Sequence, residues 1–206
     1  MYTAYTHSVY NVYMRLGLTA RRIAAAARRL LDREGAEAVT LRRVASAAGI
    51  TPMAVYRHYA GREGLLTALA EEGFQELADR LAAKRWRGDT RAQLRQMADI
   101  YLDHALEKPR LFELMFLKPR ASARRYPRDF RLGGSPTANL MVDAVKQGMA
   151  NTELRKDDAW EIVFEMGALS HGLIVLYLGG RIATSEARFR ALYRRSFRRF
   201  FHGICR

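Results

Sequence analysis

Cysteine is almost absent from this chain, which has only Cys205 among its 206 residues. An intrachain disulfide therefore cannot form, and folds that depend on such bonds are excluded. Chains without disulfides are typical of reducing compartments, so we expect a cytoplasmic protein. One cysteine is too few for a cysteine-based zinc site, and the five histidines show no paired metal-ligand spacing. We expect neither a metal site nor a cofactor.

Long hydrophobic runs are also missing. The most apolar stretch, residues 162–178, has 17 residues and includes Glu165, Ser170 and His171. A helix that spans a bilayer needs about 20 apolar residues, so we expect a buried helix here and no membrane partner. Residues 1–18 have no continuous apolar run and no charge before Arg15, a pattern unlike a signal peptide. We expect a flexible N-terminal arm.

Lysine is scarce, but arginine is not. Of the 35 basic residues 30 are arginine, and the net charge is +14. A charge this large favours polyanionic partners, and the planar guanidinium group suits phosphates and guanine edges. An arginine-rich genome composition would produce the same bias, so the charge supports nucleic acid as a partner without deciding for it. The 49% of hydrophobic residues is ordinary for a globular protein.

The hydrophobic residues recur with a period of about 3.6 nearly throughout the chain, and convincing period-2 alternation is absent. We therefore expect an all-α fold. A first helix is expected over residues 19–34, with Thr19 as its N-cap and Gly35 just past its end. A short second helix follows Thr40, which can cap it, and Gly49 stops it.

A third helix follows this glycine at once. Thr51 can cap its N-terminus, and Pro52 takes the first helical position, where its missing N–H costs nothing. The helix is expected to continue to Tyr59, and a break at residues 60–61 precedes a long fourth helix over residues 62–84. This order of helices is that of a helix-turn-helix, whose second member can lie in the major groove of DNA.

Specific residues within this layout match a known pattern. They are Ile23-Ala24-Ala25-Ala26, Gly35, Thr40-Leu41, Val44-Ala45, Ala48-Gly49-Ile50-Thr51, Val55-Tyr56-Arg57-His58-Tyr59, Arg62-Glu63 and Leu65-Leu66. With these residues the segment 19–70 resembles the DNA-binding domain of the TetR family of transcriptional repressors. Arg62 and Tyr59 replace the usual lysine and phenylalanine and keep the charge and the aromatic ring. The resemblance implies a helix-turn-helix domain over residues 19–66 and a repressor that binds a palindromic operator as a homodimer.

The resemblance and the chemistry of the side chains together predict the DNA contacts. Phosphate contacts are expected from the two helix caps, from a tyrosine and a histidine that resemble the family's backbone-contacting pair, and from two arginines. These residues are Thr40, Thr51, Tyr56, His58, Arg43 and Arg62. The candidates for reading bases are Arg42, Pro52, Met53, Ala54 and Arg57, and the two arginines are expected to supply most of the specificity. Tyr59 is expected mainly in the core.

Residues 67–206 are expected to form a helical domain for ligand binding and dimerisation. Helices are expected over residues 91–107, 109–117 and 136–149, then from a cap at Asp157 or Asp158 to residues 179–180, and last after a cap at Thr184 or Ser185. Residues 118–134 are expected to form a surface loop. The last helix carries the apolar residues Phe189, Leu192, Tyr193, Phe197, Phe200 and Phe201. The last two helices are the expected dimer face; alternatively, they fill the core of the subunit.

This second domain is similar to a C-terminal class of the same family. The similarity rests on Tyr101, Pro109, Leu111-Phe112, Met115-Phe116, Trp160 and His171-Gly172. It implies a ligand-binding core, lined by Tyr101, His104, Phe112, Met115, Phe116, Phe164, Met166 and His171. These residues suit an apolar small-molecule effector with one or two polar anchors. Aromatic residues at helical spacing also occur in a plain core.

Two other classes of protein remain as alternatives. Residues 168–172, Ala-Leu-Ser-His-Gly, nearly match the nucleophile elbow of a hydrolase, but that elbow needs a strand before it, and we expect a helix here. We therefore predict no catalytic residues and no enzyme. A non-specific DNA-binding protein or a helical adaptor, without a small-molecule effector, is the second alternative. Competition separates it from a regulator, which prefers its operator over bulk DNA by about 10³-fold or more.

Overall fold

The computed structural model describes residues 17–120 and 122–204, and all regular structure in this part of the chain is helical. The expected all-α fold is thereby confirmed. Most of the expected N-terminal arm, and Cys205, lie outside the described residues. The described residues form two compact units, one of those up to residue 76 and between 108 and 124, the other of residues 77–107 and those from 125 on. The division by role into residues 19–66 and 67–206 stays a prediction.

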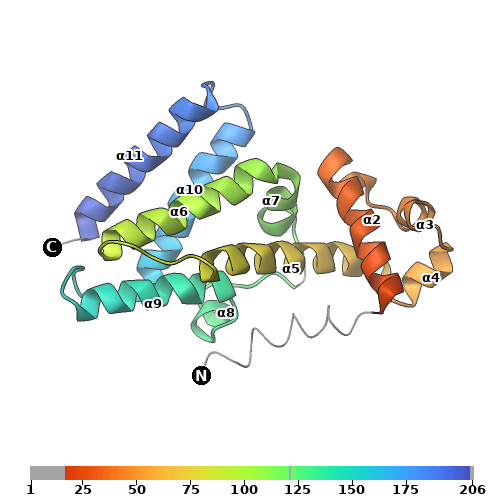
Figure 1. The fold of residues 1–206 in the computed structure, drawn as a ribbon, viewed down its shortest axis with the longest axis horizontal. Coiled ribbons are helices and arrows are strands. Elements are labelled where there is room, and N and C mark those ends of the chain that lie inside the picture. The colour runs from red at the N-terminus through yellow and green to blue at the C-terminus, as the bar shows by residue number, and fades with distance from the viewer. Residues whose placement is uncertain (1–16, 121, 205–206) are drawn as a thin grey trace. The chain divides into compact units, whose positions relative to one another are not determined.

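The first unit contains the helix-turn-helix. Its elements, drawn in Figure 1, are α2 (Leu18–Glu34), the 3₁₀ turn η1 (Ala36–Ala38), α3 (Leu41–Ala48), α4 (Pro52–Tyr56), the first part of α5 (Gly61–Ala82) and α7 (Pro109–Phe116). A continuous apolar core joins them, with Ile23, Val44, Val55, Leu69 and Leu111 all fully buried. This core fixes α3 and α4 against α2.

The capping residues set the bounds of the short helices. Thr40 Oγ1 accepts a hydrogen bond from Arg43 N at 3.3 Å, and Thr51 Oγ1 accepts one from Ala54 N at 3.3 Å. Gly49 adopts φ 64°, a left-handed conformation that glycine takes without strain. The expected caps at Thr40 and Thr51 and the expected end of the second helix at Gly49 are confirmed. Thr19 as the N-cap of α2 is wrong: the helix begins one residue earlier, and Gly17 O accepts the first bonds.

The second unit contains the last part of α5, α6 (Thr90–Glu107), α8 (Arg128–Arg131), α9 (Pro136–Ala150), α10 (Ala159–Leu178) and α11 (Glu186–Ile204). Asp158 caps α10, since its Oδ1 accepts a hydrogen bond from Trp160 N at 2.8 Å. The expected loop over residues 118–134 contains the single turn α8, which is too short to leave a hydrophobic period. Gly148 of α9 lies against α6: a Cβ atom there would come within 2.5 Å of Thr90 Cγ2.

The aromatic residues of α11 face the interior of the second unit. Phe189, Tyr193, Phe197 and Phe201 are 0–2% exposed. Tyr193 donates its hydroxyl hydrogen bond to Ala98 O at 3.0 Å, and the Phe189 ring stacks on Tyr177 at 4.0 Å. This apolar side of α11 therefore fills the core of the subunit, as the alternative interpretation has it, and a dimer face on the last two helices stays a prediction for their outward sides. An amphipathic period shows that one face is apolar, but not what covers it.

Helix α10 is the most apolar helix of the described chain. It has 20 residues and a mean hydropathy of 1.4 over its best window, so by length and composition it could cross a membrane. The helix extends the apolar stretch 162–178 back to Ala159, and its start after Asp158 and its end before Gly179 are as expected from the sequence. Phe164, Leu176 and Leu178 are 41–46% exposed. α10 therefore leaves part of its apolar surface uncovered within one subunit.

Candidate nucleic-acid interface

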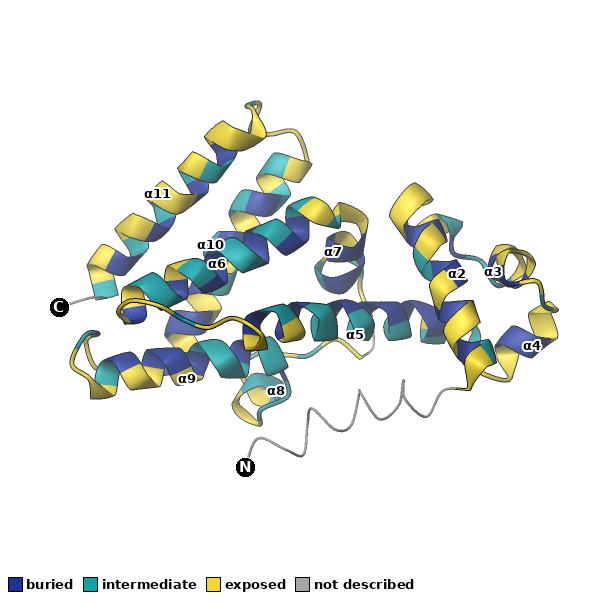
Figure 2. Cartoon of the chain, in the orientation of Figure 1, coloured by how far each residue is buried: buried dark blue, intermediate teal, exposed yellow. Residues whose placement is uncertain are grey.

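The exposed surface of the helix-turn-helix is built on α3 and α4. Within α4, Met53 and Tyr56 are 70% and 57% exposed, while Val55 is fully buried in the core. Thr51, Pro52, Arg57 and His58 are exposed beside them, as Figure 2 shows for the outer side of this helix. The buried valine orients the short helix, so the side chains around it point to solvent as a group. Such a helix presents a small set of side chains to a groove.

Ala54 differs from the other candidates for base reading. It is only 8% exposed, and together with Val55 it makes up the buried part of α4. Little of its methyl group is left for a contact with a thymine methyl. The pattern of residue types could not reveal this, since α4 is only five residues long and its buried side is set by tertiary packing.

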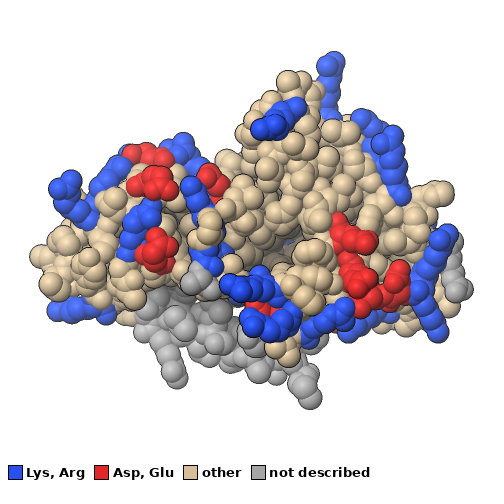
Figure 3. All heavy atoms as spheres, turned by 180° about the vertical axis from the view of Figure 1, so that it is seen from behind, with Lys and Arg blue, Asp and Glu red and all other residues tan. Residues whose placement is uncertain are grey.

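The arginines of this surface fall into two groups. Arg42 and Arg57 are exposed, and neither side chain makes a hydrogen bond or ion pair within residues 17–120 and 122–204. Arg43 Nη2 instead donates to Glu34 Oε1 at 2.7 Å, and this bond holds the pKa of Glu34 below its usual value. A guanidinium group without a partner is available for guanine O6 and N7. Figure 3 shows basic and acidic side chains interspersed on one face of the molecule.

Arg62 holds the connection between α2 and α3. Its Nε donates to Val39 O at 3.0 Å, its Nη2 donates to Ala36 O at 2.8 Å, and Glu37 forms an ion pair with it at 3.1 Å. The guanidinium group thus binds carbonyl groups in and next to η1. These bonds occupy donors that a phosphate clamp would need. The sequence favoured a phosphate clamp because Arg62 lies at the start of α5. Its hydrogen bonds instead join it to Val39 and Ala36, which precede it in the chain by 23 and 26 positions.

We expect Arg62→Ala to lower the free energy of unfolding of the first unit by about 1–3 kcal/mol, because two carbonyl groups lose a charged partner. Urea unfolding followed by far-ultraviolet circular dichroism measures the change. Arg57→Ala, which removes an exposed arginine without intramolecular bonds, is the matched control and should leave stability nearly unchanged. Equal stability of the Arg62 and Arg57 variants, with a flatter salt dependence of DNA binding only for Arg62→Ala, would instead favour the phosphate clamp.

Tyr59 lies in the core, as the sequence predicts. It is 7% exposed, and its hydroxyl group donates to Ala20 O at 3.1 Å. Burial and the nearby Glu72 carboxylate raise its pKa to about 12, so the hydroxyl stays a donor. Sequence analysis missed Arg22, whose Nη2 donates to Ala48 O at 2.7 Å and so ties α2 to the end of α3. No local pattern signals a bond over 26 residues.

The residues predicted to bind a ligand do not lie in one compact unit. Phe112, Met115 and Phe116 belong to α7 in the first unit, and Leu111, Leu114 and Met115 are part of the helix-turn-helix core. The other members belong to the second unit; they are Tyr101, His104, Phe164, Met166 and His171. Nothing in the pattern of residue types indicates this division.

Two of these residues in the second unit are in direct contact. Tyr101 Oη lies 3.0 Å from His171 Nε2, and His171 Nδ1 lies 2.9 Å from Gly167 O. Burial lowers the pKa of His171, and the hydrogen bond with Gly167 opposes this effect. His104 and Met166 are buried, whereas Phe164 is 46% exposed and stacks on Tyr126 at 4.0 Å. The Tyr101–His171 pair is the polar part of the predicted set.

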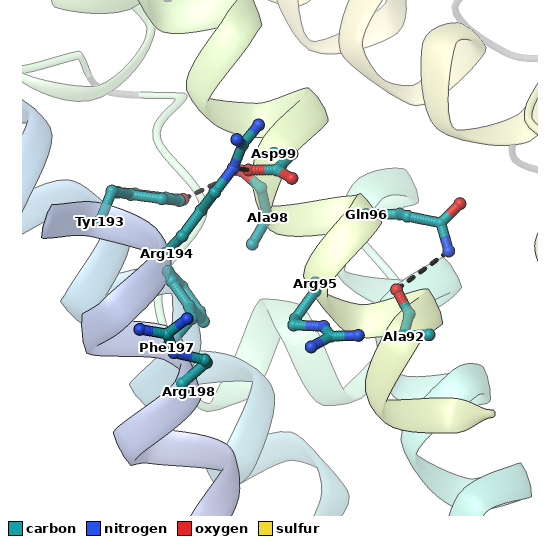
Figure 4. A pocket seen from close by; sticks show the side chains of 9 residues that line it. All are labelled: Ala92, Arg95, Gln96, Ala98, Asp99, Tyr193, Arg194, Phe197 and Arg198. Carbon is teal, nitrogen blue, oxygen red and sulfur yellow. Dashed lines mark hydrogen bonds and ion pairs between the residues drawn. The ribbon is translucent and has the colours of Figure 1, made fainter. Parts of the chain in front are cut away.

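A groove of about 330 Å³ lies between α6 and α11 in the second unit. Figure 4 shows Arg95, Gln96 and Asp99 on one side and Tyr193, Arg194 and Arg198 on the other. Arg194 Nε donates to Asp99 Oδ1 at 3.0 Å across it. The groove contains none of the predicted ligand-binding residues. This groove therefore does not mark a site at which the predicted residues would bind a ligand.

Comparison with known proteins agrees with this geometry. Residues 23–69 match the family model described as bacterial regulatory proteins, tetR family, and residues 94–200 match the tetracyclin repressor-like C-terminal domain. An uncharacterized HTH-type transcriptional regulator, YobS of Bacillus subtilis (strain 168), is 30% identical over 104 residues. That match covers 50% of this chain and 54% of the relative, so the aligned part spans about half the length of YobS.

Solved structures share the fold over nearly the whole chain. A protein of unknown function from Rhodococcus sp. RHA1 is 26% identical, with a TM-score of 0.77 over 93% of this chain and 98% of that one. A putative tetR family transcription regulator from Shewanella sp. PV-4 has a TM-score of 0.67 at 19% identity, over 92% of this chain and 100% of that one. On the two family-model matches, which together cover the helix-turn-helix and more than half of the chain, this protein belongs to the tetR family of transcriptional regulators.

Proposed function

We propose that this protein is a cytoplasmic repressor that binds a palindromic operator as a homodimer and is released from it by a small-molecule effector. The observation that carries the proposal is the exposed face of α4. Met53, Tyr56 and Arg57 are exposed there on a helix whose Val55 is fully buried. Side chains that are solvated as a group on a rigid helix suit the major groove. The unpartnered Arg42 lies on the preceding helix.

The phosphate contacts follow from the same geometry. Thr40 and Thr51 already cap α3 and α4. A phosphate oxygen would meet the backbone N–H groups of Leu41 and Arg42 at the start of α3, and that of Met53 at the start of α4, where Pro52 has none. Tyr56 and His58 are exposed beside them and can donate to phosphate without burying a charge. We assign positioning on the DNA to these four residues and base reading to Arg42 and Arg57.

A second copy of the chain is the proposed partner of α10. The exposed residues of this helix include Phe164, Ala168, Gly172 and Leu176, which together make an apolar surface with two small residues at its centre. The outward side of α11 is basic instead, since Arg188, Arg195 and Arg199 are exposed there. The proposed interface therefore rests on α10, with α11 at its edge. A two-fold dimer would place two α4 helices about 34 Å apart, one for each half-site.

Selection of bound sequences from a random DNA pool tests this function. We expect enrichment of a two-fold symmetric consensus, because two equivalent α4 helices read two half-sites. Competition with bulk DNA should then show a preference of about 10³-fold or more for the selected site. Enrichment of a consensus that lacks two-fold symmetry would contradict binding of the operator as a dimer. The absence of any enrichment would instead favour a DNA-coating protein that acts through charge alone.

The proposed release by an effector is tested through the effect that effector and operator have on each other's affinity. If an effector lowers operator affinity by some factor, the operator must lower effector affinity by the same factor. A titration of effector with and without operator DNA measures both. Unchanged effector affinity in the presence of operator would refute the allosteric mechanism and leave DNA binding intact.

A further inference from the structure

Four residues of the first unit form a charged cluster that DNA binding does not use. Glu71 and Phe74 lie on α5, and Arg120 and Arg124 lie in the segment after α7. Arg124 Nη2 donates to Glu71 Oε2 at 2.5 Å, whereas Arg120 Nη1 is 3.9 Å from Glu71 Oε1. Both guanidinium groups lie over the Phe74 ring, at 5.8 Å for Arg120 and 5.1 Å for Arg124. We call these residues the Arg120 cluster.

Arg120 is deeply buried and poorly hydrogen-bonded. Its side chain is 4% exposed, and its Nη2 donates to Met115 O at 2.7 Å. Its Nε and Nη1 have no hydrogen-bond partner among the residues that the structure describes. Burial lowers the pKa of this guanidinium, Glu71 opposes the effect, and Arg124 adds to it. Buried donors without partners are rare, because each costs free energy, and they call for a missing acceptor.

The charges of the cluster do not balance. Two guanidinium groups share one carboxylate, which Arg124 already binds through both of its oxygens. Cation–π contact with Phe74 stabilises the guanidinium groups but leaves the excess of one positive charge. One more carboxylate would neutralise the cluster and accept from the free donors of Arg120. A phosphate dianion would overcompensate a single excess charge.

An apolar wall adjoins this excess charge. The Phe116 ring meets the Phe74 ring edge-on at 5.1 Å and lies 5.0 Å from the Phe112 ring. Arg124 and Glu71 are 22% and 21% exposed, so one side of the cluster reaches solvent while Arg120 lies at its inner end. A carboxylate can thus reach the guanidinium groups from the side of Arg124 and accept hydrogen bonds beside Glu71. A flat apolar body attached to it would lie beside Phe74 and Phe116.

We propose that the Arg120 cluster binds the carboxylate of a small organic acid with an aromatic or similarly apolar body. This inference rests on the proposed function, and it gives the class of effector that the repressor answers to. Glu71 and Phe74 lie on α5, the helix that starts at Gly61 directly after the helix-turn-helix. A ligand carboxylate shared by Arg120 and Arg124 changes how Glu71 of α5 is bound to the segment after α7 within the same unit. Operator affinity is then expected to fall when the acid binds.

Thermal unfolding of the full chain with sodium benzoate, against sodium chloride at equal ionic strength, tests the site. We expect benzoate to raise the unfolding temperature of the natural protein by at least about 2–4 °C at saturation. Arg120→Met should abolish this rise and should itself unfold no earlier than the natural protein, because it removes a buried, under-bonded charge. Arg125→Met is the matched control, since the Arg125 side chain is exposed; it should respond like the natural protein.

Glu71→Gln separates a binding site from a structural ion-pair network. Without the competing carboxylate, calorimetric titration should show benzoate binding tighter by on the order of tenfold, since a hydrogen bond to a charged group is worth about 1.5–3 kcal/mol. No response of the natural protein, or an equal response of Arg120→Met, would overturn the proposal, as would a response to inorganic phosphate alone. A protein that selects an operator but ignores benzoate refutes only this inference; one that binds benzoate but selects no operator refutes only the proposed function.

Discussion

Arg57→Ala is expected to reduce the preference for one base pair in each half-site by roughly 5- to 150-fold, or about 1–3 kcal/mol. The guanidinium group of Arg57 is exposed and has no partner within the described residues, so alanine removes a contact with DNA and nothing inside the protein. Arg42→Ala should have the same kind of effect at a different base pair, because Arg42 lies on α3. Competition between the selected operator and its single-base-pair variants measures both changes.

Arg43→Ala is the matched control for these variants. Arg43 is bound to Glu34 at 2.7 Å, and the sequence predicts a phosphate contact for it, so its removal should weaken binding to all sequences alike. The slope of log affinity against log salt should then flatten by about 0.9 for each phosphate that is no longer neutralised. If Arg42→Ala and Arg57→Ala also weaken binding to every sequence equally, the division between base-reading and phosphate-binding arginines is wrong.

Phe197→Ala is expected to lower the free energy of unfolding by about 3–5 kcal/mol, the cost of a cavity left by a large ring in a packed core. Phe197 is 2% exposed, and its ring lies 4.9 Å from that of Tyr193 and 5.7 Å from that of Phe201. The effect should be independent of protein concentration, because these rings pack within one subunit. Urea unfolding at two protein concentrations measures it.

Leu176→Ala provides the contrast on α10. Leu176 is 41% exposed, so its truncation should change the unfolding of the subunit by far less than Phe197→Ala does. If α10 forms the dimer interface, Leu176→Ala should raise the dimer dissociation constant measured by sedimentation. A Phe197→Ala variant that dissociates without unfolding more easily would place the aromatic stripe at an interface, against its burial in the subunit.

Local signals in the sequence predicted the helix-turn-helix closely. Thr40, Gly49, Thr51 and Pro52 act through bonds or conformations within four residues of themselves, so their types alone mark where α3 and α4 begin and where α3 ends. Asp158 likewise marks the start of α10, because its side chain accepts hydrogen bonds from Trp160 N and Glu161 N close by in the chain. The expected end of the third helix at Tyr59 is wrong: α4 stops at Tyr56, with no glycine or proline to mark its end.

Side-chain bonds between distant segments could not be predicted in the same way. Arg62 binds the carbonyl group of Val39, and Arg120 lies near Glu71, 49 positions earlier in the chain. An arginine of either kind looks like a solvated charge when only its neighbours in sequence are known. The aromatic stripe of α11 shows the same limit, since its period indicates the apolar side but not the helix that covers it.

The close approach of α9 to α6 at Gly148 bears on attempts to make this protein more robust. Replacing helix glycines with alanine commonly adds up to about 1 kcal/mol of stability, and position 148 lies inside a helix of 15 residues. Here the added methyl group would collide with Thr90, whose Cβ would be only 2.9 Å away and whose backbone N–H is bound by Glu153. Engineering for heat resistance should therefore spare this glycine and begin at Gly167 or Gly203, where a methyl group meets no other atom within 4 Å.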